Sequence, residues 1–368
     1  MLTVDVSSLI RARIEKEGAI TIKEFMTHVS RVQNEYFVPN PSIQKKSESY
    51  SIRNKRSMFG ETIADWCVNF WKANKKPKDL KVIVFCPRSG VLISKILERE
   101  KDTAFKNAIT IYIVEPNSYF TKIQKQNLKN YSKKIKWVDA FEKISTGTPS
   151  IVLANKFFSS LPIAQYTRKR GDWLVNMVSL SMNKQYFCIT HLKKLNNNIS
   201  QYLDSKYPQV QEGGIIELHD ETSVLLKKIV EDIKKFGGGI LLIDQGYFNS
   251  NKRGFTSTLQ AASKKRWTPI FYKLGNSFLS AQLNFFKLRE SIELYGGQVH
   301  GPITQKDFLR NMQIDKKKEK LLEQLPKHKH QYLLNEYERL TCEKQLGHLF
   351  KVMAICNFSN DLVGFTSL

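Results

Sequence analysis

Apolar and polar residues follow two alternating periods along this chain, and the alternation predicts strands interleaved with helices. An apolar, β-branched run over residues 82–85 is typical of a buried parallel strand. A turn containing Pro87 and Gly90 follows it, and apolar residues over 91–97 then fit a helix packed on a sheet. Further buried strands are predicted at 109–114, 135–137, 150–155 and 240–244. A chain built in this way is expected to fold as an α/β protein with a mostly parallel, doubly wound sheet.

The remaining periodic segments add helices and shorter strands. Helical spacing covers 6–32, where Gly18 ends a first helix and Thr21 caps a second, and Thr304 is expected to cap a helix over 306–312. Other helices are predicted at 58–73, 120–131 and 223–236, with more helices within 255–325. Strands are predicted at 173–178, 186–189, 215–218 and 349–356. Polar segments at 36–57 and 193–210 interrupt the pattern, and the first of them is predicted to be a loop.

Length and composition describe a folded globular protein. The chain has 368 residues, of which 41% are hydrophobic, and this suits one large domain or two closely packed lobes. No apolar run approaches the roughly 18–20 residues that cross a bilayer, so we expect a soluble protein. The cysteines are odd in number and scattered, at Cys67, Cys86, Cys188, Cys342 and Cys356. Without a Cys-x-x-Cys pair or a secretory signal, they predict a reducing compartment and neither disulfides nor a zinc site.

Charge is the unusual feature of the composition. Lysine and arginine number 58 against 34 acids, which gives a formal net charge of +24. The basic residues concentrate over 45–56, 72–81, 122–136, 264–266 and 316–327. Such an excess attracts polyanions such as RNA or anionic lipid. The alternative is a solvated, lysine-rich surface without a partner, and composition does not separate the two.

The strand, turn and helix over 82–97 form the arrangement in which α/β folds bind nucleotide-like ligands. The next strand ends in Glu115, and an acid at that point can accept hydrogen bonds from both ribose hydroxyls of an adenosine cofactor. The alternative role for Glu115 is to cap the following helix. Only Gly90 remains in a turn where several glycines would be expected.

Blocks spread over nearly all of residues 5–365 resemble one known family. They include Ile20–Met26, Phe59–Glu61, Val82–Leu97, Val114–Ser118, Asn155–Pro162, Gly171–Trp173, Gly239–Tyr247, Gly301–Gln305 and Leu346–Val352. The chain resembles the MidA-like S-adenosylmethionine (SAM)-dependent methyltransferases. Mitochondrial members of that family serve in assembly of respiratory complex I and methylate an arginine of one of its subunits. The resemblance implies a Rossmann-like class I methyltransferase fold with SAM as cofactor.

The resemblance also implies a division into consecutive parts. An N-terminal helical segment would cover 1–75, and the methyltransferase core would cover 76–250 with an insertion near 190–212. A helical substrate or partner lobe would follow over 251–330. Residues 331–368 would supply a C-terminal helix and a strand that completes the sheet.

The chain departs from the family at the cofactor turn. The family has an acid and three glycines there, and this chain has Val84, Cys86 and Arg88 in place of the acid and two of the glycines. Glycine serves at such positions because a Cβ atom would meet the cofactor or force an unfavourable φ. The residues left for cofactor binding are Cys86, Pro87, Gly90 and Glu115, which we interpret as a vestigial or weak site.

The acceptor site departs in the same direction. The family carries two acids after the fourth strand of its sheet, which suit a guanidinium, and here they are Lys156 and Ser159. A further acidic block reads Gln282 and Asn284. If the protein were active, Glu61 and Asn155 would be the remaining catalytic candidates.

These losses favour a non-catalytic member of the family, an assembly factor for a respiratory complex or the mitochondrial ribosome that acts by protein or RNA binding. The first alternative is an active SAM-dependent protein arginine methyltransferase of the complex I assembly type. A second alternative is an RNA methyltransferase, because fold alone does not fix the substrate. Family and basicity imply the mitochondrial matrix, with the cytoplasm as the alternative.

Overall fold

The computed structural model describes residues 5–36, 57–98, 103–145, 147–248, 254–263, 266–358 and 361–365. The chain divides into two compact units. Unit 1 comprises Met1–Val38, Ser159–Leu225 and Asn249–Asn284, and unit 2 comprises Pro39–Phe158, Leu226–Phe248 and Phe285–Leu368. This division follows contacts in space rather than consecutive segments, and the four-part division expected from the sequence stays a prediction. Most of the loop predicted at 36–57 lies outside the described residues.

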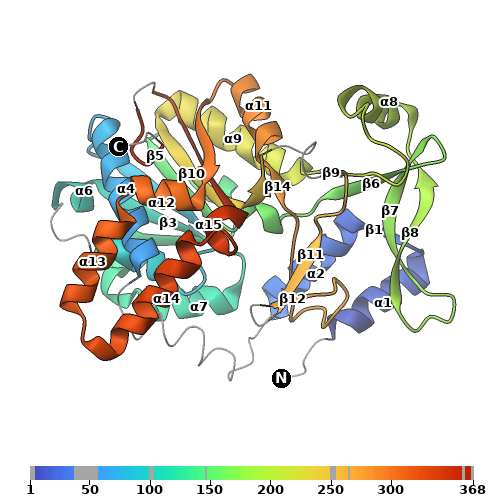
Figure 1. Cartoon of the computed structure of the whole chain (residues 1–368), viewed down its shortest axis with the longest axis horizontal. Helices are drawn as coiled ribbons and strands as arrows, with labels where there is room; N and C mark the ends of the chain where they lie inside the picture. Colours follow the sequence, from blue (N-terminus) through green and yellow to red (C-terminus); the bar gives the residue numbers. More distant parts are fainter. Residues whose placement is uncertain are drawn as a thin grey trace. The chain divides into compact units, whose positions relative to one another are not determined.

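Unit 2 is built on the parallel sheet that the apolar runs predicted (Figure 1). Its strands are β2 (Leu80–Phe85), β3 (Ile109–Val114), β4 (Ile135–Val138), β5 (Ser150–Asn155), β10 (Gly238–Tyr247), β15 (Gln298–Thr304) and β16 (Phe350–Cys356). They lie in the order β15-β16-β10-β5-β2-β3-β4. Neighbouring strands from β10 to β4 pair in parallel, and β16 runs antiparallel to both β10 and β15. The predicted doubly wound, mostly parallel sheet is confirmed.

The strands of this sheet alternate their side chains between two covered faces. On β2, Val82 and Val84 join the same buried cluster as Ile111 of β3 and Leu153 of β5, and Ile83 between them is also buried. Burial on both faces explains why the strands are continuous apolar runs rather than alternating ones. The surrounding helices are α4 (Met58–Ala73), α5 (Val91–Leu97), α6 (Thr103–Ala108), α7 (Ser118–Asn127), α9 (Asp220–Phe236), α11 (Phe285–Leu294), α12 (Gln305–Asn311), α13 (Ile314–Gln324), α14 (His330–Thr341) and α15 (Leu346–Leu349).

Helix α4 contributes the largest side chains to that buried cluster. Trp66 and Phe70 lie with ring centroids 5.1 Å apart, and neither is more than 1% exposed. The helix begins after Ser57, whose hydroxyl accepts a hydrogen bond from the backbone N–H of Gly60. Helices α13 and α14 lie beside α4 although they come more than 200 residues later (Figure 1). The helix predicted at 58–73 is confirmed, and its apolar side chains belong to the core of unit 2.

Unit 1 contains antiparallel sheets. Strand β7 (Asp172–Leu180) pairs with β1 (Ile20–Thr21), β6 (Ala164–Lys169) and β8 (Phe187–Lys194), and β6 also pairs with β9 (Ile215–Leu218). The other sheet consists of β11 (Gln260–Ser263), β12 (Arg266–Thr268) and β13 (Phe278–Ser280). The helices predicted within 255–325 are present as α11, α12 and α13, but the first part of that range contains strands instead. Residues 260–263, 266–268 and 278–280 form short strands, because their neighbours in the sheet rather than their own weak periodicity decide their state.

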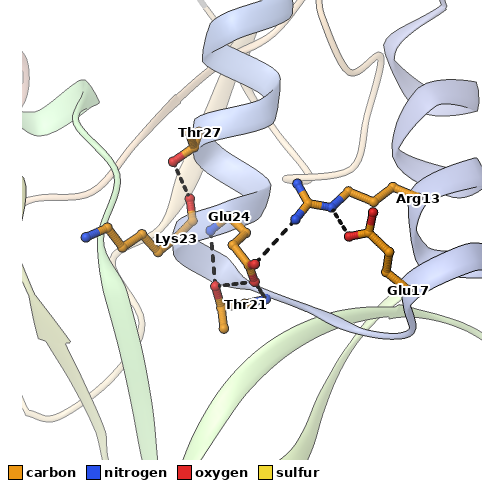
Figure 2. A network of polar contacts seen from close by, with 6 residues as sticks. All are labelled: Arg13, Glu17, Thr21, Lys23, Glu24 and Thr27. Atoms are coloured by element: carbon orange, nitrogen blue, oxygen red, sulfur yellow. Dashed lines mark hydrogen bonds and ion pairs between the residues drawn. The ribbon is translucent and has the colours of Figure 1, made fainter.

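The N-terminal helices of unit 1 start and stop where the sequence predicted. Helix α1 (Val6–Glu17) ends at Gly18, and α2 (Ile22–Tyr36) begins at a reciprocal cap formed by Thr21 and Glu24 (Figure 2). The N–H of Glu24 donates to Thr21 Oγ1 over 3.1 Å, and Thr21 N–H donates to Glu24 Oε2 over 2.7 Å. Arg13 of α1 donates to both Glu17 and Glu24 and so links the two helices. The polar segment 193–210 also contains a helix, α8 (Asn197–Lys206).

Among the residues described, no helix is both long and apolar enough to pass through a membrane.

Candidate functional site

The carboxyl ends of β2, β3, β5 and β10 meet at one edge of the unit 2 sheet, which we call the carboxyl edge. The turn that leaves β2 has a glycine-like backbone at three positions, of which only Gly90 is a glycine. Cys86 has φ 43°, Arg88 has φ 51° and Gly90 has φ 83°. For the two side-chain-bearing residues this left-handed conformation costs about 1–2 kcal/mol each. The turn therefore places two side chains at positions where glycine is favoured.

Helix α7 fixes this turn through hydrogen bonds from two of its side chains. Gln124 is fully buried, and its Nε2 donates to the carbonyl oxygen of Arg88 over 2.8 Å. Asn127 Nδ2 donates to the carbonyl oxygen of Ser89 over 2.9 Å. A Cβ on Gly90 would lie 2.9 Å from Leu128 Cδ1, so this position requires glycine for space as well as for φ. Two amide side chains and one glycine thus fix the turn against α7.

Glu115 lies at the end of β3, as predicted, and its carboxylate is enclosed. The residue is 6% exposed. Its Oε1 accepts from the N–H of Asn117 over 3.1 Å, and its Oε2 accepts from Gln124 Nε2 over 3.0 Å. Burial raises the pKa of Glu115 to about 7, against the opposing effects of these hydrogen bonds and of the Arg88 charge. The helix cap of α7 is Asn117, which accepts from Tyr119 and Phe120, so Glu115 is not that cap.

Cys86 lies close to this carboxyl group. Burial raises the pKa of the Cys86 thiol far above its usual range, and the charge of Glu115 raises it further. The thiol therefore stays protonated, and Cys86 is not an activated nucleophile. Pro87 contributes the carbonyl that accepts the N–H of Gly90 over 3.0 Å and so closes the turn.

The residues that leave β5 bring positive charge to the carboxyl edge. Lys156 has φ 58°, and its Nζ lies 4.5 Å from the ring centroid of Phe350. The ring shields this ammonium although the residue as a whole is exposed. Shielding from water lowers the pKa of Lys156 to about 8, and the neighbouring charges of Arg88 and Arg339 lower it further. The positive charge of Arg88 therefore lowers the pKa of Glu115, at the end of β3, and the pKa of Lys156, beyond β5. These two strands flank β2, which precedes Arg88.

A second pair of charges lies opposite each other in adjacent strands. Asp244 of β10 faces Lys351 of β16 in register, and the two are 0% and 3% exposed. Lys351 donates to the carbonyl of His348, and its Nζ lies 4.9 Å from the ring centroid of Phe248. Burial lowers the pKa of Lys351 to about 8. We interpret Asp244 as a buried structural residue among the surrounding strand ends, because a ligand in solution cannot reach its carboxylate.

Asn155 and Glu61, the remaining catalytic candidates, occupy different surroundings. Asn155 ends β5, and its Oδ1 is buried with no hydrogen-bond partner among the described residues. Glu61 lies in the first turn of α4, and its negative charge raises the pKa of Glu336 of α14. The carboxylate of Glu336 accepts a hydrogen bond from Ser57 Oγ. Arg339 acts on both Glu336 and Lys156, so this acidic pair borders the basic group at the carboxyl edge.

Unit 1 contains a half-buried carboxylate that the sequence did not single out. Glu217 of β9 accepts from Thr258 N–H over 2.8 Å, from Thr258 Oγ1 over 2.6 Å and from Gln165 Nε2 over 2.9 Å. The backbone N–H of Gln282 donates to the same Thr258 hydroxyl, and Ser159 accepts from the N–H of Ala281. The two blocks in which the family has acids, around 159 and 282, thus come together in unit 1. The acid in the otherwise apolar strand 215–218 was the available signal for Glu217.

The strand order and the turn after β2 define a Rossmann-like methyltransferase fold, and comparisons with known proteins agree. Residues 62–303 match a family model described as "Putative S-adenosyl-L-methionine-dependent methyltransferase". The chain belongs to this family. A solved structure of a Burkholderia thailandensis protein bound to S-adenosyl-homocysteine superposes with a TM-score of 0.77 at 17% identity, over 98% of this chain and 94% of that one.

Curated relatives match over most of their length. The zebrafish (Danio rerio) protein arginine methyltransferase NDUFAF7, mitochondrial, is 25% identical over 95% of this chain and 86% of its own length. The human (Homo sapiens) protein of the same name is 23% identical over 93% of this chain and 81% of its own length. The predicted membership of the MidA-like group is confirmed by these matches.

The residues at the carboxyl edge match SAM poorly in charge and in bulk. In favour of SAM stand Glu115 at the end of β3 and the unpartnered Oδ1 of Asn155, which could accept from an ammonium group. Against it stand the side chains of Cys86 and Arg88 in the turn, and the enclosure of Glu115. SAM carries a sulfonium and an ammonium, and Lys156 adds a further cation beside Arg88. We therefore assign no catalytic step to these residues.

Proposed function

We propose that this protein is a non-catalytic member of its methyltransferase family that acts by binding a partner. The observation that carries the proposal is the turn after β2. Two of its three residues with positive φ, Cys86 and Arg88, bear side chains at the place where a cofactor approaches the backbone. The charge of Arg88 affects the pKa values of Glu115 and Lys156, which follow the two flanking strands, so the substitution also adds positive charge to the carboxyl edge.

The acceptor side of the site supports the same proposal. Transfer of a methyl group to a guanidinium requires a carboxylate to hold its charge and to take its proton. Lys156 stands where the resemblance implies one acid and would repel such a substrate, and Ser159 stands where it implies the other. Ser159 is 3% exposed, so it offers little surface to any acceptor.

The proposed setting is assembly of a respiratory complex or of the mitochondrial ribosome, in the mitochondrial matrix. The relatives named as mitochondrial protein arginine methyltransferases support the compartment. A methyltransferase fold without methyl transfer would serve there as a binding scaffold, since burial of the sheet on both faces does not depend on the turn.

Isothermal titration calorimetry with SAM tests the proposal. We expect no saturable heat for the wild-type protein below about 1 mM SAM. The double variant Cys86→Gly/Arg88→Gly should gain measurable binding, because it restores glycine at both positive-φ positions without changing the backbone path. Lys184→Gly is the matched control, since Lys184 also has positive φ (55°) but lies in the β7–β8 hairpin of unit 1.

The alternative is an active SAM-dependent methyltransferase, and the retained turn backbone with Glu115 beside it is the observation that favours it. Micromolar binding of SAM to the wild-type protein, lost in Glu115→Ala, would contradict the non-catalytic proposal. A search for the methyl acceptor would then follow, with arginine-containing peptides and RNA as the two substrate classes.

A further inference from the structure

Helix α7 has an inner face that holds the cofactor turn and an outer face that carries lysines. An open hollow of about 600 Å³ lies on the outer face. Its lining is Ser118, Thr121, Lys122, Lys125 and Gln126 of α7 with Lys129, which lies two residues beyond the end of the helix, and we call this set the α7 lysine face. These residues follow helical spacing, and Lys122, Lys125 and Lys129 are all exposed (Figure 1 shows α7). The hollow therefore presents ammonium, hydroxyl and amide groups together.

No acid offsets this charge nearby in the sequence. Residues 118–136 contain six lysines and neither aspartate nor glutamate. Within the described part of the chain, Lys122, Lys125 and Lys129 form no ion pair. A second hollow in unit 2 differs, because there Lys228 pairs with Glu142 over 2.7 Å. The α7 lysine face is thus a site of uncompensated positive charge rather than an ordinary mixed surface.

An aromatic ring borders the same face. Lys125 Nζ lies 5.6 Å from the ring centroid of Trp137, and Trp137 Nε1 donates to Gln124 Oε1 over 3.2 Å. Gln124 is itself buried and hydrogen-bonded to the cofactor turn, so the indole is fixed in place. Trp137 is half-buried against the core of unit 2 and lies beneath Lys125, and an aromatic ring beside basic side chains is common in sites for single-stranded nucleic acid.

The geometry fits a phosphate backbone better than other anionic partners. Lys122 and Lys125 lie about 4.5 Å apart along the axis of α7, and Lys129 follows just beyond its C-terminal end, so three ammonium groups lie along one side of the hollow where they can meet a run of phosphates. The large exposed apolar residues of the described chain lie elsewhere, so this face lacks the side chains that insert into a membrane. Protein interfaces are depleted of lysine in their centres. Hydroxyl and amide groups that both donate and accept also suit the 2′-hydroxyl of RNA.

We propose that the α7 lysine face binds single-stranded RNA through its phosphate backbone. The proposal rests on the proposed function in one respect, because it names RNA as a partner class of the binding scaffold. It adds that the contact surface lies on the outer face of α7, whereas the altered cofactor turn lies against the inner face. RNA binding and SAM binding are therefore measured independently of each other.

Fluorescence anisotropy with a labelled 12-nucleotide uridine oligomer tests the proposal on the full chain. The variant Lys122→Ala/Lys125→Ala/Lys129→Ala should weaken binding at least ~10-fold near 0.1 M salt, and should reduce the slope of log K against log salt by about 2. Alanine favours helix, so the variant should fold, and its thermal midpoint checks this. The matched control is Lys316→Ala/Lys320→Ala/Lys327→Ala, which removes the same charge from exposed lysines elsewhere in unit 2.

Each outcome decides the proposal. A selective loss in the α7 variant, with the control close to wild type, supports a localised RNA site. Equal losses in both variants would assign binding to net charge alone and overturn it. Absence of RNA binding by the wild-type protein would overturn it as well, and a clearly higher affinity for a deoxythymidine oligomer of the same length would overturn RNA as the partner. Neither result changes the SAM titration, so failure here is distinct from failure of the proposed function.

Discussion

The strands of the unit 2 sheet and the turns at their carboxyl edge lie next to each other but follow different physical rules. The strands are apolar and buried on both faces, with Val82, Ile111 and Leu153 between 0% and 2% exposed. The turns that follow them carry charges and left-handed residues, of which Arg88 and Lys156 are examples. The family fold is maintained by the first set and its chemistry by the second.

This difference explains how a fold can remain when its chemistry changes. A buried aliphatic side chain contributes about 1.5–3 kcal/mol through burial, so few sequences satisfy the strand positions. A left-handed residue in a turn costs about 1–2 kcal/mol, which the rest of the domain tolerates. A substitution in the turns at the carboxyl edge therefore costs less stability than a substitution in the strands, but it has the larger effect on function.

The largest expected effect on stability comes from a cavity among the buried strands. Ile111→Ala should lower the free energy of unfolding by about 2–5 kcal/mol, because Ile111 is fully buried in β3 and its neighbours can collapse only in part. Urea denaturation followed by circular dichroism measures the loss. The matched control is Ile189→Ala, since Ile189 is also on a strand but 40% exposed, and its effect should stay within about 0.5 kcal/mol. Equal losses would mean that burial in the sheet is not what holds the fold.

The ionisable groups at the carboxyl edge should make the free energy of unfolding depend on pH. The pKa of Glu115 is raised from 4.5 to about 7 in the folded protein, so between these values the folded state binds more protons than the unfolded state. This group's contribution to stability is therefore largest at low pH and is lost as pH rises toward 7. From pH 5.5 to 7.5 the loss amounts to ~2 kcal/mol.

Glu115→Gln separates this term from the other titrations, because the amide does not ionise. Urea denaturation of both proteins at pH 5.5 and 7.5 should show a larger decrease for the wild type than for Glu115→Gln. Buried His219, whose pKa burial lowers to about 4, acts in the opposite sense but equally in both proteins. Parallel pH profiles would contradict a raised pKa at Glu115.

The sequence predicted the strands of unit 2 well for the same reason that they are stable. An uninterrupted β-branched run such as 109–114 has one stable environment, a sheet covered on both faces, so local pattern and global fold agree. The caps at Thr21 and Thr304 were also predictable, since each depends on residues three positions away.

The sheet β11–β13 and the carboxylate network of Glu217 could not be predicted in this way. Strands 260–263 and 278–280 are short, and their state depends on partners distant in sequence. Glu217 is satisfied by Thr258, 41 residues away, which no local pattern reveals. The sequence likewise showed that Cys86 and Arg88 replace glycines, but only the backbone showed that their left-handed conformation was kept.

The smallest expected effect on stability concerns the left-handed conformation of Arg88 in the turn after β2. Arg88→Gly removes the strain of a left-handed residue, worth about 1–2 kcal/mol, but adds about 0.5–1 kcal/mol of chain entropy to the unfolded state. The free energy of unfolding should therefore stay constant or rise by up to about 1.5 kcal/mol. Ser89→Gly, at the neighbouring residue without positive φ, should instead lower it by about 0.5–1 kcal/mol. If urea denaturation shows both variants destabilised alike, the Arg88 side chain stabilises the turn by more than its backbone strain costs, and the edge would then be selected for stability as the strands are.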